Sequence, residues 1–126
     1  MKYFQTATME NTFMKIAVIG SRNLHVKNIG EYLPGDITEI ISGGAKGVDT
    51  CAAEYANAHA IKLTELRPDY RRYGRGVPLK RNLEIIQNAD LVIAFWDTRS
   101  RGTKHVIETC SKMGIPVRII EMPQES

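Results

Sequence analysis

Apolar and polar residues alternate along the chain in blocks that predict strands and helices in turn. The run Ile16–Ile19, closed by Gly20, is typical of a strand buried on both faces. Within Val48–His59 the apolar residues recur at helical spacing, which predicts a helix with one buried face. The other predicted strands are Thr38–Ser42, Lys62–Leu66, Leu91–Phe95 and Pro116–Ile120, and the other predicted helices are about Val26–Leu33, a helix that Pro78 opens, and about Thr103–Met113.

This succession of strands and helices with short connections predicts one α/β domain. Strands joined through helices form a parallel sheet with helices on both faces. We expect the more polar strand, Lys62–Leu66, near an edge of the sheet and the most hydrophobic one, Leu91–Phe95, at its centre. In the helix after Pro78, the apolar residues expected on the buried side are Leu79, Leu83, Ile85 and Ile86.

Length and composition agree with a single soluble domain. The chain has 126 residues, of which 43% are hydrophobic and 25% charged, which excludes disordered, collagen-like and disulfide-scaffold classes. The longest apolar stretch, Leu91–Trp96, is far shorter than the roughly 20 residues of a membrane-spanning helix, so no membrane partner is expected. Residues 1–13 are polar and lack the apolar run of a secretion signal. We expect them to be an extension before a domain at 14–126, with Met14 as a conceivable alternative start.

The cysteines and histidines do not form a metal-binding pattern. Cys51 and Cys110 stand far apart, and His25, His59 and His105 are scattered. Two lone thiols are typical of a reducing compartment, so we expect a cytoplasmic protein without a metal ion. Neither a Gly-x-Gly-x-x-Gly fingerprint nor a Walker-type phosphate loop occurs, which argues against an NAD dehydrogenase or such an NTPase. No cofactor is predicted.

Positive charge is concentrated in one segment. The whole chain has a formal net charge of +3, whereas Arg67–Arg81 alone carries six basic residues and one acidic residue. The remainder is therefore mildly acidic, unlike a protein that coats nucleic acid. Such a segment suits a small anionic ligand, an acidic partner or a phosphate backbone. Tyr70 and Tyr73 are aromatics that would favour single-stranded DNA, although nucleic acid is not the partner we expect.

The segment Ser42–Asp49 is the strongest candidate for ligand chemistry. It joins a predicted strand to a predicted helix and is rich in small residues, so its backbone N–H groups can approach an anion at a helix N-terminus. We expect a phosphate cradle here, and the alternative is a tight turn whose glycines only provide positive φ. Asp49 either favours the helix start or contacts a ligand hydroxyl.

Other candidates lie at the edge where an open parallel sheet binds ligands, beyond the carboxyl ends of its strands. Gly20–Arg22 supplies a hydroxyl and a guanidinium that can grip phosphate or carboxylate. Arg81 and Asn82 are expected to point at the cleft, because the apolar residues of their helix must face the sheet. Asn82 is then placed to meet a ribose or base.

The segment Trp96–Thr103 adds a second strand-to-helix connection. Gly102 permits close backbone approach, and Thr103 can cap its helix or bind an anion with its hydroxyl. Asp97 is expected to meet ribose or base. Trp96 either packs in the core, which we favour, or stacks on a base.

Four motifs in order resemble the SLOG superfamily, the Rossmann-like group that joins DprA (SMF) DNA-processing proteins to LOG phosphoribohydrolases, and within it the small stand-alone YspA-like members. The motifs are Ile19-Gly20-Ser21-Arg22, Ser42–Asp49, Pro78-x-x-Arg81-Asn82 and Arg101-Gly102-Thr103, and the resemblance runs from Lys15 to Ile120. It implies a Rossmann-like domain with a five-stranded parallel sheet of order 3-2-1-4-5. It also implies a nucleotide or nucleotide-derived ligand and a homo-oligomer.

The chain departs from the LOG enzymes at their catalytic motif. Those enzymes have a Gly-rich turn before their Gly-Thr and a glutamate two to three residues after the threonine. Here Arg99-Ser100-Arg101 precedes Gly102, and His105 and Val106 occupy the later positions. Cleavage of an N-glycosidic bond needs a carboxylate beside an oxocarbenium-like transition state, so the hydrolase activity is not carried over.

The leading hypothesis is binding, or sensing, of a phosphorylated nucleotide or nucleotide-derived small molecule. One alternative is a nucleotide N-glycosidase that uses Asp49, Asp97 or Glu108, and another is single-stranded DNA binding through residues 67–81. No catalytic residue is assigned. The predicted binding residues are Gly20, Ser21, Arg22, Ser42, Gly43, Gly44, Ala45, Gly47, Asp49, Arg81, Asn82, Asp97, Gly102 and Thr103.

Overall fold

The described residues form one parallel sheet of five strands. The computed structural model describes residues 14–44, 46–67 and 77–123. The strands are β1 (Lys15–Gly20), β2 (Glu39–Ser42), β3 (Lys62–Glu65), β4 (Leu91–Trp96) and β5 (Val117–Glu121). They pair in parallel in the order β3-β2-β1-β4-β5, which confirms the predicted α/β class and the strand order implied by the resemblance.

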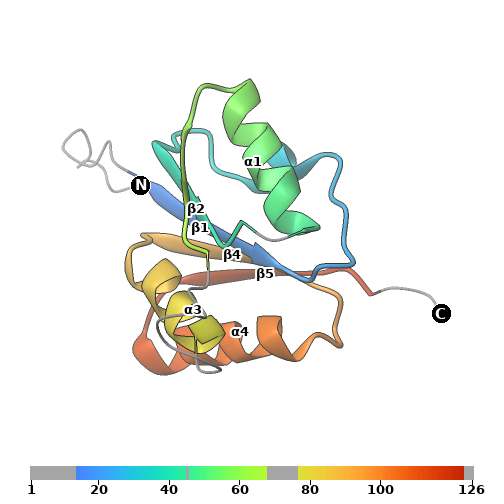
Figure 1. Cartoon of the computed structure of the whole chain (residues 1–126), viewed down its shortest axis with the longest axis vertical. Coiled ribbons are helices and arrows are strands. Elements are labelled where there is room, and N and C mark those ends of the chain that lie inside the picture. Colours follow the sequence, from blue (N-terminus) through green and yellow to red (C-terminus); the bar gives the residue numbers. More distant parts are fainter. Residues whose placement is uncertain (1–13, 45, 68–76, 124–126) are drawn as a thin grey trace, which may run out of the picture.

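Helices cover both faces of this sheet. Helix α1 (Val48–Ala58) lies on one face, whereas α3 (Val77–Gln87) and α4 (Arg101–Met113) lie together on the other (Figure 1). None of the described helices is both long and apolar enough to cross a membrane. Cys51 lies on α1 and Cys110 on α4, and both are free thiols in buried positions.

The alternation of side chains along each strand divides the core into two parts. In β1, Ile16 and Val18 pack on the α1 side, and Ala17 and Ile19 pack on the side of α3 and α4. Successive strand residues point to opposite faces, so a strand covered on both faces must be apolar throughout. Burying each large aliphatic side chain stabilises the fold by about 1.5–3 kcal/mol relative to exposure. The apolar run that predicted β1 is therefore a direct consequence of this double burial.

The prediction of a helix at about Val26–Leu33 is wrong. The chain forms only a short 3₁₀ helix η2 (Ile29–Tyr32), and Leu24 and Val26 are buried against the α1 side of the sheet from an irregular loop. Gly30 lies so close to Tyr55 that an added Cβ would be 2.5 Å from its ring. Glycine and asparagine are weak helix formers, and the apolar spacing here reports burial of a loop rather than a helical face.

Two expectations about hydrophobic segments also need correction, and one is confirmed. The central strand is β1, with β4 beside it, while β3 lies at an edge as predicted. Both β1 and β4 are buried on two faces, so hydrophobicity alone does not rank them. In α3, Ile85 and Ile86 are buried as expected, but Leu83 is 37% exposed because the helix turns that side outward.

Several predictions fall on residues outside the described ranges. The polar extension at 1–13 is one, and most of the basic segment, residues 68–76 with Tyr70 and Tyr73, is another. Ala45 of the glycine loop and the side chain of Leu79 are also outside the description. These predictions remain as they stand.

Candidate functional site

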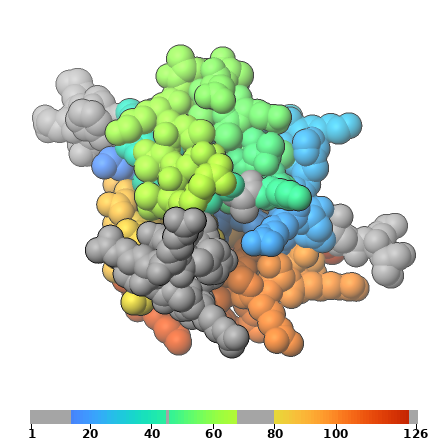
Figure 2. Space-filling model, in the orientation of Figure 1, coloured from blue at the N-terminus to red at the C-terminus, as the bar shows by residue number. Residues whose placement is uncertain are grey.

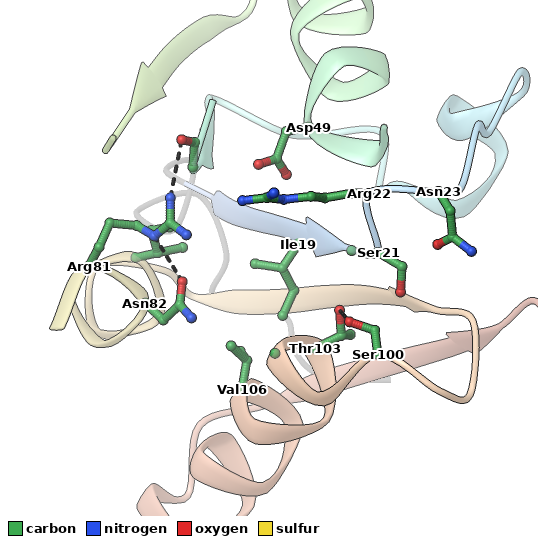
Figure 3. A pocket seen from close by; sticks show the side chains of 14 residues that line it. Ile19, Ser21, Arg22, Asn23, Asp49, Arg81, Asn82, Ser100, Thr103 and Val106 are labelled. Carbon is green, nitrogen blue, oxygen red and sulfur yellow. Dashed lines mark hydrogen bonds between the residues drawn. The ribbon is translucent and has the colours of Figure 1, made fainter. Parts of the chain in front are cut away.

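A cavity lined by both polar and apolar residues lies beyond the carboxyl end of β1. Its volume is about 490 Å³, within the roughly 300–1,000 Å³ of typical small-molecule sites. The loop after β1, the loop before α1, the second turn of α3 and the first turns of α4 surround it (Figure 3). In Figure 2, the loop after β1 (blue) lies against the start of α1 and above the segment that opens α4 (orange). The site is therefore where the topology of an open parallel sheet places ligands.

The cavity combines an apolar floor with charged and amide side chains. Its apolar lining residues are Ile19, Ile85 and Val106. Arg22 and Asp49 extend into it, and Figure 3 shows Arg22 reaching across the cavity in the direction of Arg81. With two arginines and one aspartate, the described lining carries one net positive charge. Such a lining suits a ligand that has both an anionic group and a flat or apolar part.

Nine of the predicted binding residues line this cavity. They are Gly20, Ser21, Arg22, Gly43, Asp49, Arg81, Asn82, Gly102 and Thr103. The structure brings these together from four separate segments of the chain. Ser42, Gly44, Gly47 and Asp97 are close by but do not line the cavity, and Ala45 lies outside the described residues.

Five lining residues were not among the predicted binding residues, and two of them had a usable signal in the sequence. They are Ile19, Asn23, Ile85, Ser100 and Val106. Ile85 lies four residues after Arg81 and Val106 lies three after Thr103, so each shares a helical face with a predicted residue. Extending each motif along its own helix would therefore have found both residues.

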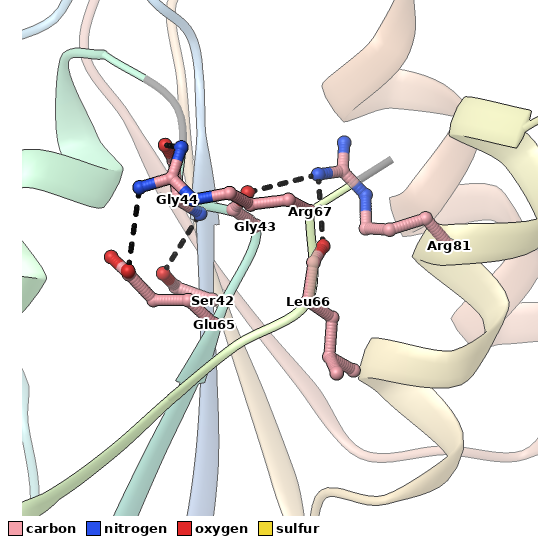
Figure 4. Close-up of polar contacts among 7 residues, drawn as sticks. All are labelled: Ser42, Gly43, Gly44, Glu65, Leu66, Arg67 and Arg81. Atoms are coloured by element: carbon pink, nitrogen blue, oxygen red, sulfur yellow. Dashed lines mark hydrogen bonds and ion pairs between the residues drawn. The ribbon is translucent and has the colours of Figure 1, made fainter. Parts of the chain in front are cut away.

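Two arginines hold the carbonyl groups of the glycine loop before α1. Arg81 Nη1 donates to Gly43 O at 3.2 Å and to Leu66 O at 3.3 Å, and Arg67 Nη1 donates to Gly44 O at 2.7 Å (Figure 4). Within the loop, the Gly44 N–H donates to Ser42 Oγ at 3.2 Å. The guanidinium of Arg81 therefore fastens α3 to the ends of β2 and β3 as well as lining the cavity.

The glycines at this end of the sheet allow the loop after β1 to touch the start of α1. Gly47 has φ 76° and ψ −123°, and an added Cβ would lie 2.4 Å from the carbonyl oxygen of Arg22. A Cβ on Gly20 would lie 2.5 Å from Cγ2 of Val48. Packing thus requires glycine at both positions. For Gly47 the turn interpretation accounts for the residue without any ligand.

Asp97 organises the loop between β4 and α4. Its Oδ1 accepts backbone N–H groups of Arg99 at 2.9 Å and Ser100 at 2.7 Å. Burial opposes ionisation of this carboxylate, but hydrogen bonds from Ser100, Arg99, Ser21 and Asn23 outweigh it and lower the pKa of Asp97. The carboxylate is consequently ionised and committed to the protein backbone, beside the cavity rather than in it.

The neighbouring tryptophan supports the same loop. Trp96 is half-buried, and its Nε1–H donates to the carbonyl oxygen of Ser100 at 3.0 Å. It belongs to neither of the two core clusters and does not line the cavity. Trp96 therefore does not pack in either core cluster, and its indole N–H holds the start of α4, while stacking on a base stays a prediction.

The N-terminus of α4 has open space beside Gly102. Gly102 lines the cavity, and no heavy atom lies within 4 Å of a Cβ added there. Thr103 is buried, and its Oγ1 accepts from Ser100 Oγ at 3.4 Å. A helix N-terminus carries about half a positive charge, so an anion in this space would be stabilised.

The three carboxylates considered for catalysis separate in the structure. Asp49 is buried and lines the cavity, whereas Glu108 is exposed on α4 and, like Asp97, lies outside the lining. Within the described ranges, no three His, Cys, Asp or Glu side chains are grouped to hold a metal ion. Of the three candidate carboxylates, Asp49 is therefore the one that lines the cavity.

Comparison with known proteins connects this geometry to a family. A family model described as the YspA, cpYpsA-related SLOG family matches residues 14–73. The Gene 61 protein of Mycobacterium phage D29 is 36% identical over 84 residues, which cover 62% of this chain and 67% of the phage protein. No solved structure matches the chain. The family match includes the motifs at Ile19–Arg22 and Ser42–Asp49, while the motifs at Arg81 and Thr103 lie beyond it.

Proposed function

Because this chain belongs to the YspA, cpYpsA-related SLOG family, a membership consistent with nucleotide-related binding or processing, we propose that it binds a phosphorylated nucleotide or nucleotide-derived molecule. The observation that carries this proposal is the cavity of about 490 Å³, in which two arginines and the N-termini of two helices surround an apolar floor. Binding alone suffices for a sensor.

The phosphate is expected between Arg22 and the start of α4. Arg22 is exposed and extends into the cavity, and Gly102 leaves space for an anion to approach the helix backbone. A charge-assisted hydrogen bond contributes about 1.5–3 kcal/mol. Two or three such contacts with the helix N-terminus are compatible with a Kd of roughly 1 μM, or about 8 kcal/mol.

The base or ribose is expected on the apolar side of the cavity. Ile19, Ile85 and Val106 provide a surface for a flat ring, and Asn82 provides an amide next to it. Asn82 Oδ1 accepts a hydrogen bond from Arg81 Nε at 2.9 Å, which holds the Asn82 amide beside Arg81 at the cavity wall. Because the cavity combines positive charge with an apolar floor, we expect a nucleotide to bind more tightly than inorganic phosphate alone.

Isothermal titration calorimetry with matched variants tests the proposal. The ligands are nucleoside monophosphates, cyclic dinucleotides and ADP-ribose, each compared with its unphosphorylated nucleoside where one exists. Arg22→Gln removes the cavity guanidinium, and Arg99→Gln removes an exposed arginine outside the cavity lining. We expect Arg22→Gln to weaken binding by about tenfold or more, since one charged hydrogen bond is lost, and Arg99→Gln to leave Kd almost unchanged. Absence of binding across the panel up to millimolar ligand would contradict the proposal.

A second candidate function, N-glycosidic cleavage of a bound nucleotide, is favoured by one observation. Asp49 is a buried carboxylate in the same cavity as Arg22 and Arg81. Chromatography of a nucleotide mixture incubated with the protein tests for release of free base. Asp49→Asn should abolish the release while Glu108→Gln should not. Unchanged nucleotides after prolonged incubation would exclude this activity for the panel used.

Cytoplasmic location and homo-oligomeric assembly stay predictions from the sequence. Sedimentation of the full chain measures its assembly directly. Single-stranded DNA binding also stays a prediction, because most of the basic segment lies outside the described residues.

A further inference from the structure

Cys51 and His25 meet in a second cavity, which shares no lining residue with the first. This cavity of about 230 Å³ lies between α1 and the loop after β1, and we call it the thiol cavity. His25 Nδ1 lies 3.6 Å from Cys51 Sγ, and the backbone N–H of Val26 donates to the same sulfur at 3.4 Å. The sulfur therefore has an imidazole nitrogen and a backbone N–H donor beside it at the wall of a cavity.

This arrangement is the one that nucleophilic thiol chemistry needs. The thiolate is the reactive form of cysteine, and a neighbouring imidazole can take its proton. His25 is exposed, so its ring can exchange that proton with solvent. Cys51 is itself only 5% exposed and belongs to the core cluster on the α1 side, but it lines the thiol cavity. Cys110 provides the contrast within the same chain, because it is fully buried under α4 and burial raises the pKa of its thiol.

The charges of the thiol cavity indicate the kind of reactant. Lys27 and Glu54 both line it, and both are exposed. A cavity of this volume is smaller than the roughly 300–1,000 Å³ of drug-sized ligand sites. It suits a small molecule that has both a carboxylate, for Lys27, and an ammonium group, for Glu54. Amino-acid thiols and their disulfides have this combination.

We propose that Cys51 is a thiol-modification site that forms a mixed disulfide with the disulfide of a small amino-acid thiol. The Cys51 sulfur attacks one sulfur of the reactant, a new S–S bond forms, and the original S–S bond breaks. His25 takes the Cys51 proton and passes it to the leaving sulfur, which departs as a free thiol. Cys51 is oxidised and the departing half of the reactant is reduced. This site is independent of the proposed nucleotide function.

The test uses cystine and the two cysteines of the native full chain. Peptide mass spectrometry measures the rate at which each cysteine gains a half-cystine, first in native buffer and then in denaturant. We expect Cys51 to react at least about tenfold faster than Cys110 in the native chain, and the two rates to converge in denaturant, because access and proton transfer control thiol reactivity. Equal native rates would overturn the proposal.

Two histidine variants separate proton transfer from simple exposure. His25→Gln removes the imidazole beside Cys51, and His105→Gln removes an exposed imidazole on α4. The Cys51 rate is read as a ratio to the Cys110 rate. Because unfolding brings the two rates together, the Cys110 rate itself must stay at its native value in each variant for the ratio to be used. We expect His25→Gln to lower the ratio severalfold and His105→Gln to leave it unchanged. A ratio unaffected by His25→Gln would overturn the role of the pair.

The ligand class is tested by charge. Cystamine has the disulfide and the amino groups of cystine but no carboxylate. We expect the native chain to prefer cystine, and Lys27→Gln to lose that preference while still reacting with cystamine. A Lys27→Gln chain that reacts with cystine as fast as the native chain would overturn the assigned class of reactant.

Discussion

Two loops that contain glycine lie at the same edge of the sheet and each leads into a helix, yet the space around them differs. In the loop between β2 and α1, a Cβ would lie 2.3 Å from Arg81 Nη1 at Gly43, 2.9 Å from Arg67 Cζ at Gly44 and 2.4 Å from a backbone oxygen at Gly47. In the loop between β4 and α4, a Cβ on Gly102 would meet no atom within 4 Å. The fold requires glycine at Gly47, where the contact is with backbone and φ is 76°, and Gly44 also has a positive φ of 71°. At Gly43 the contact is with the flexible end of Arg81, and at Gly102 the fold does not require glycine.

This difference changes which loop carries the ligand signal. The run of small residues at Ser42–Asp49 is the more conspicuous one in the sequence, but packing against neighbouring loops and arginines explains much of it. A single glycine at the second position of α4 lowers helix stability relative to alanine without relieving a clash. Space kept free at a helix N-terminus is what an anionic ligand would use.

The largest expected effect is on the first loop. Gly47→Ala places a Cβ against the Arg22 carbonyl at a φ of 76°, so we expect it to lower the free energy of unfolding by roughly 2–4 kcal/mol. Urea denaturation followed by circular dichroism measures this. The same substitution at Gly102 is the matched control. If both variants were equally stable, the proposed contrast between the loops would be wrong.

An intermediate effect is expected at Asp97, whose carboxylate holds the second loop in shape. Asp97→Asn removes charged hydrogen bonds to two backbone N–H groups and should cost about 1–3 kcal/mol at pH 7. The folded-state pKa is lowered, so this stabilisation is present above the unfolded pKa of about 3.9 and is lost as pH falls through the folded value.

The pH dependence of the free energy of unfolding distinguishes the loss of a charged hydrogen bond from a simple packing defect. The native chain should therefore approach the stability of Asp97→Asn as the pH is lowered from about 5 through 3. Asp36→Asn, at an exposed position, serves as the control for loss of one negative charge. A stability difference between the native chain and Asp97→Asn that stayed constant with pH would show that ionisation is not its source.

The smallest effect on stability is expected at Gly102, and it has the opposite sign. Gly102→Ala should leave the fold unchanged or stabilise it by up to about 1 kcal/mol, because alanine is the better helix former. We expect the added methyl group to reduce the space at the part of the cavity wall that Gly102 forms, so nucleotide affinity should fall by about tenfold, or about 1.4 kcal/mol. Thermal unfolding and calorimetry on the same sample measure both quantities. Unchanged affinity would place the phosphate elsewhere in the cavity.

The periodicity of hydrophobic residues predicted the architecture well. It failed where residues are buried from an irregular loop and not from a helix or strand. Runs such as Ile16–Ile19 were apolar because β1 is covered on both faces. The loop containing Leu24 and Val26 is buried equally well without forming the predicted helix, and Leu83 is exposed although its position in the pattern was apolar. The spacing of hydrophobic residues indicates which residues are buried. It indicates only indirectly which secondary structure buries them.

The sequence alone determined the strands of the sheet, the helices α1, α3 and α4, and the edge at which four separate motifs meet, because strand ends and helix starts are encoded in local runs of residues. Tertiary structure decided how the side chains at that edge are used. It directed the Asp97 carboxylate to backbone N–H groups of its own loop and the Arg81 guanidinium to backbone carbonyl groups. It also brought His25 to Cys51, which is 26 positions away in the sequence. Those contacts depend on how loops pack against one another, and a short stretch of sequence does not encode the distance between two loops.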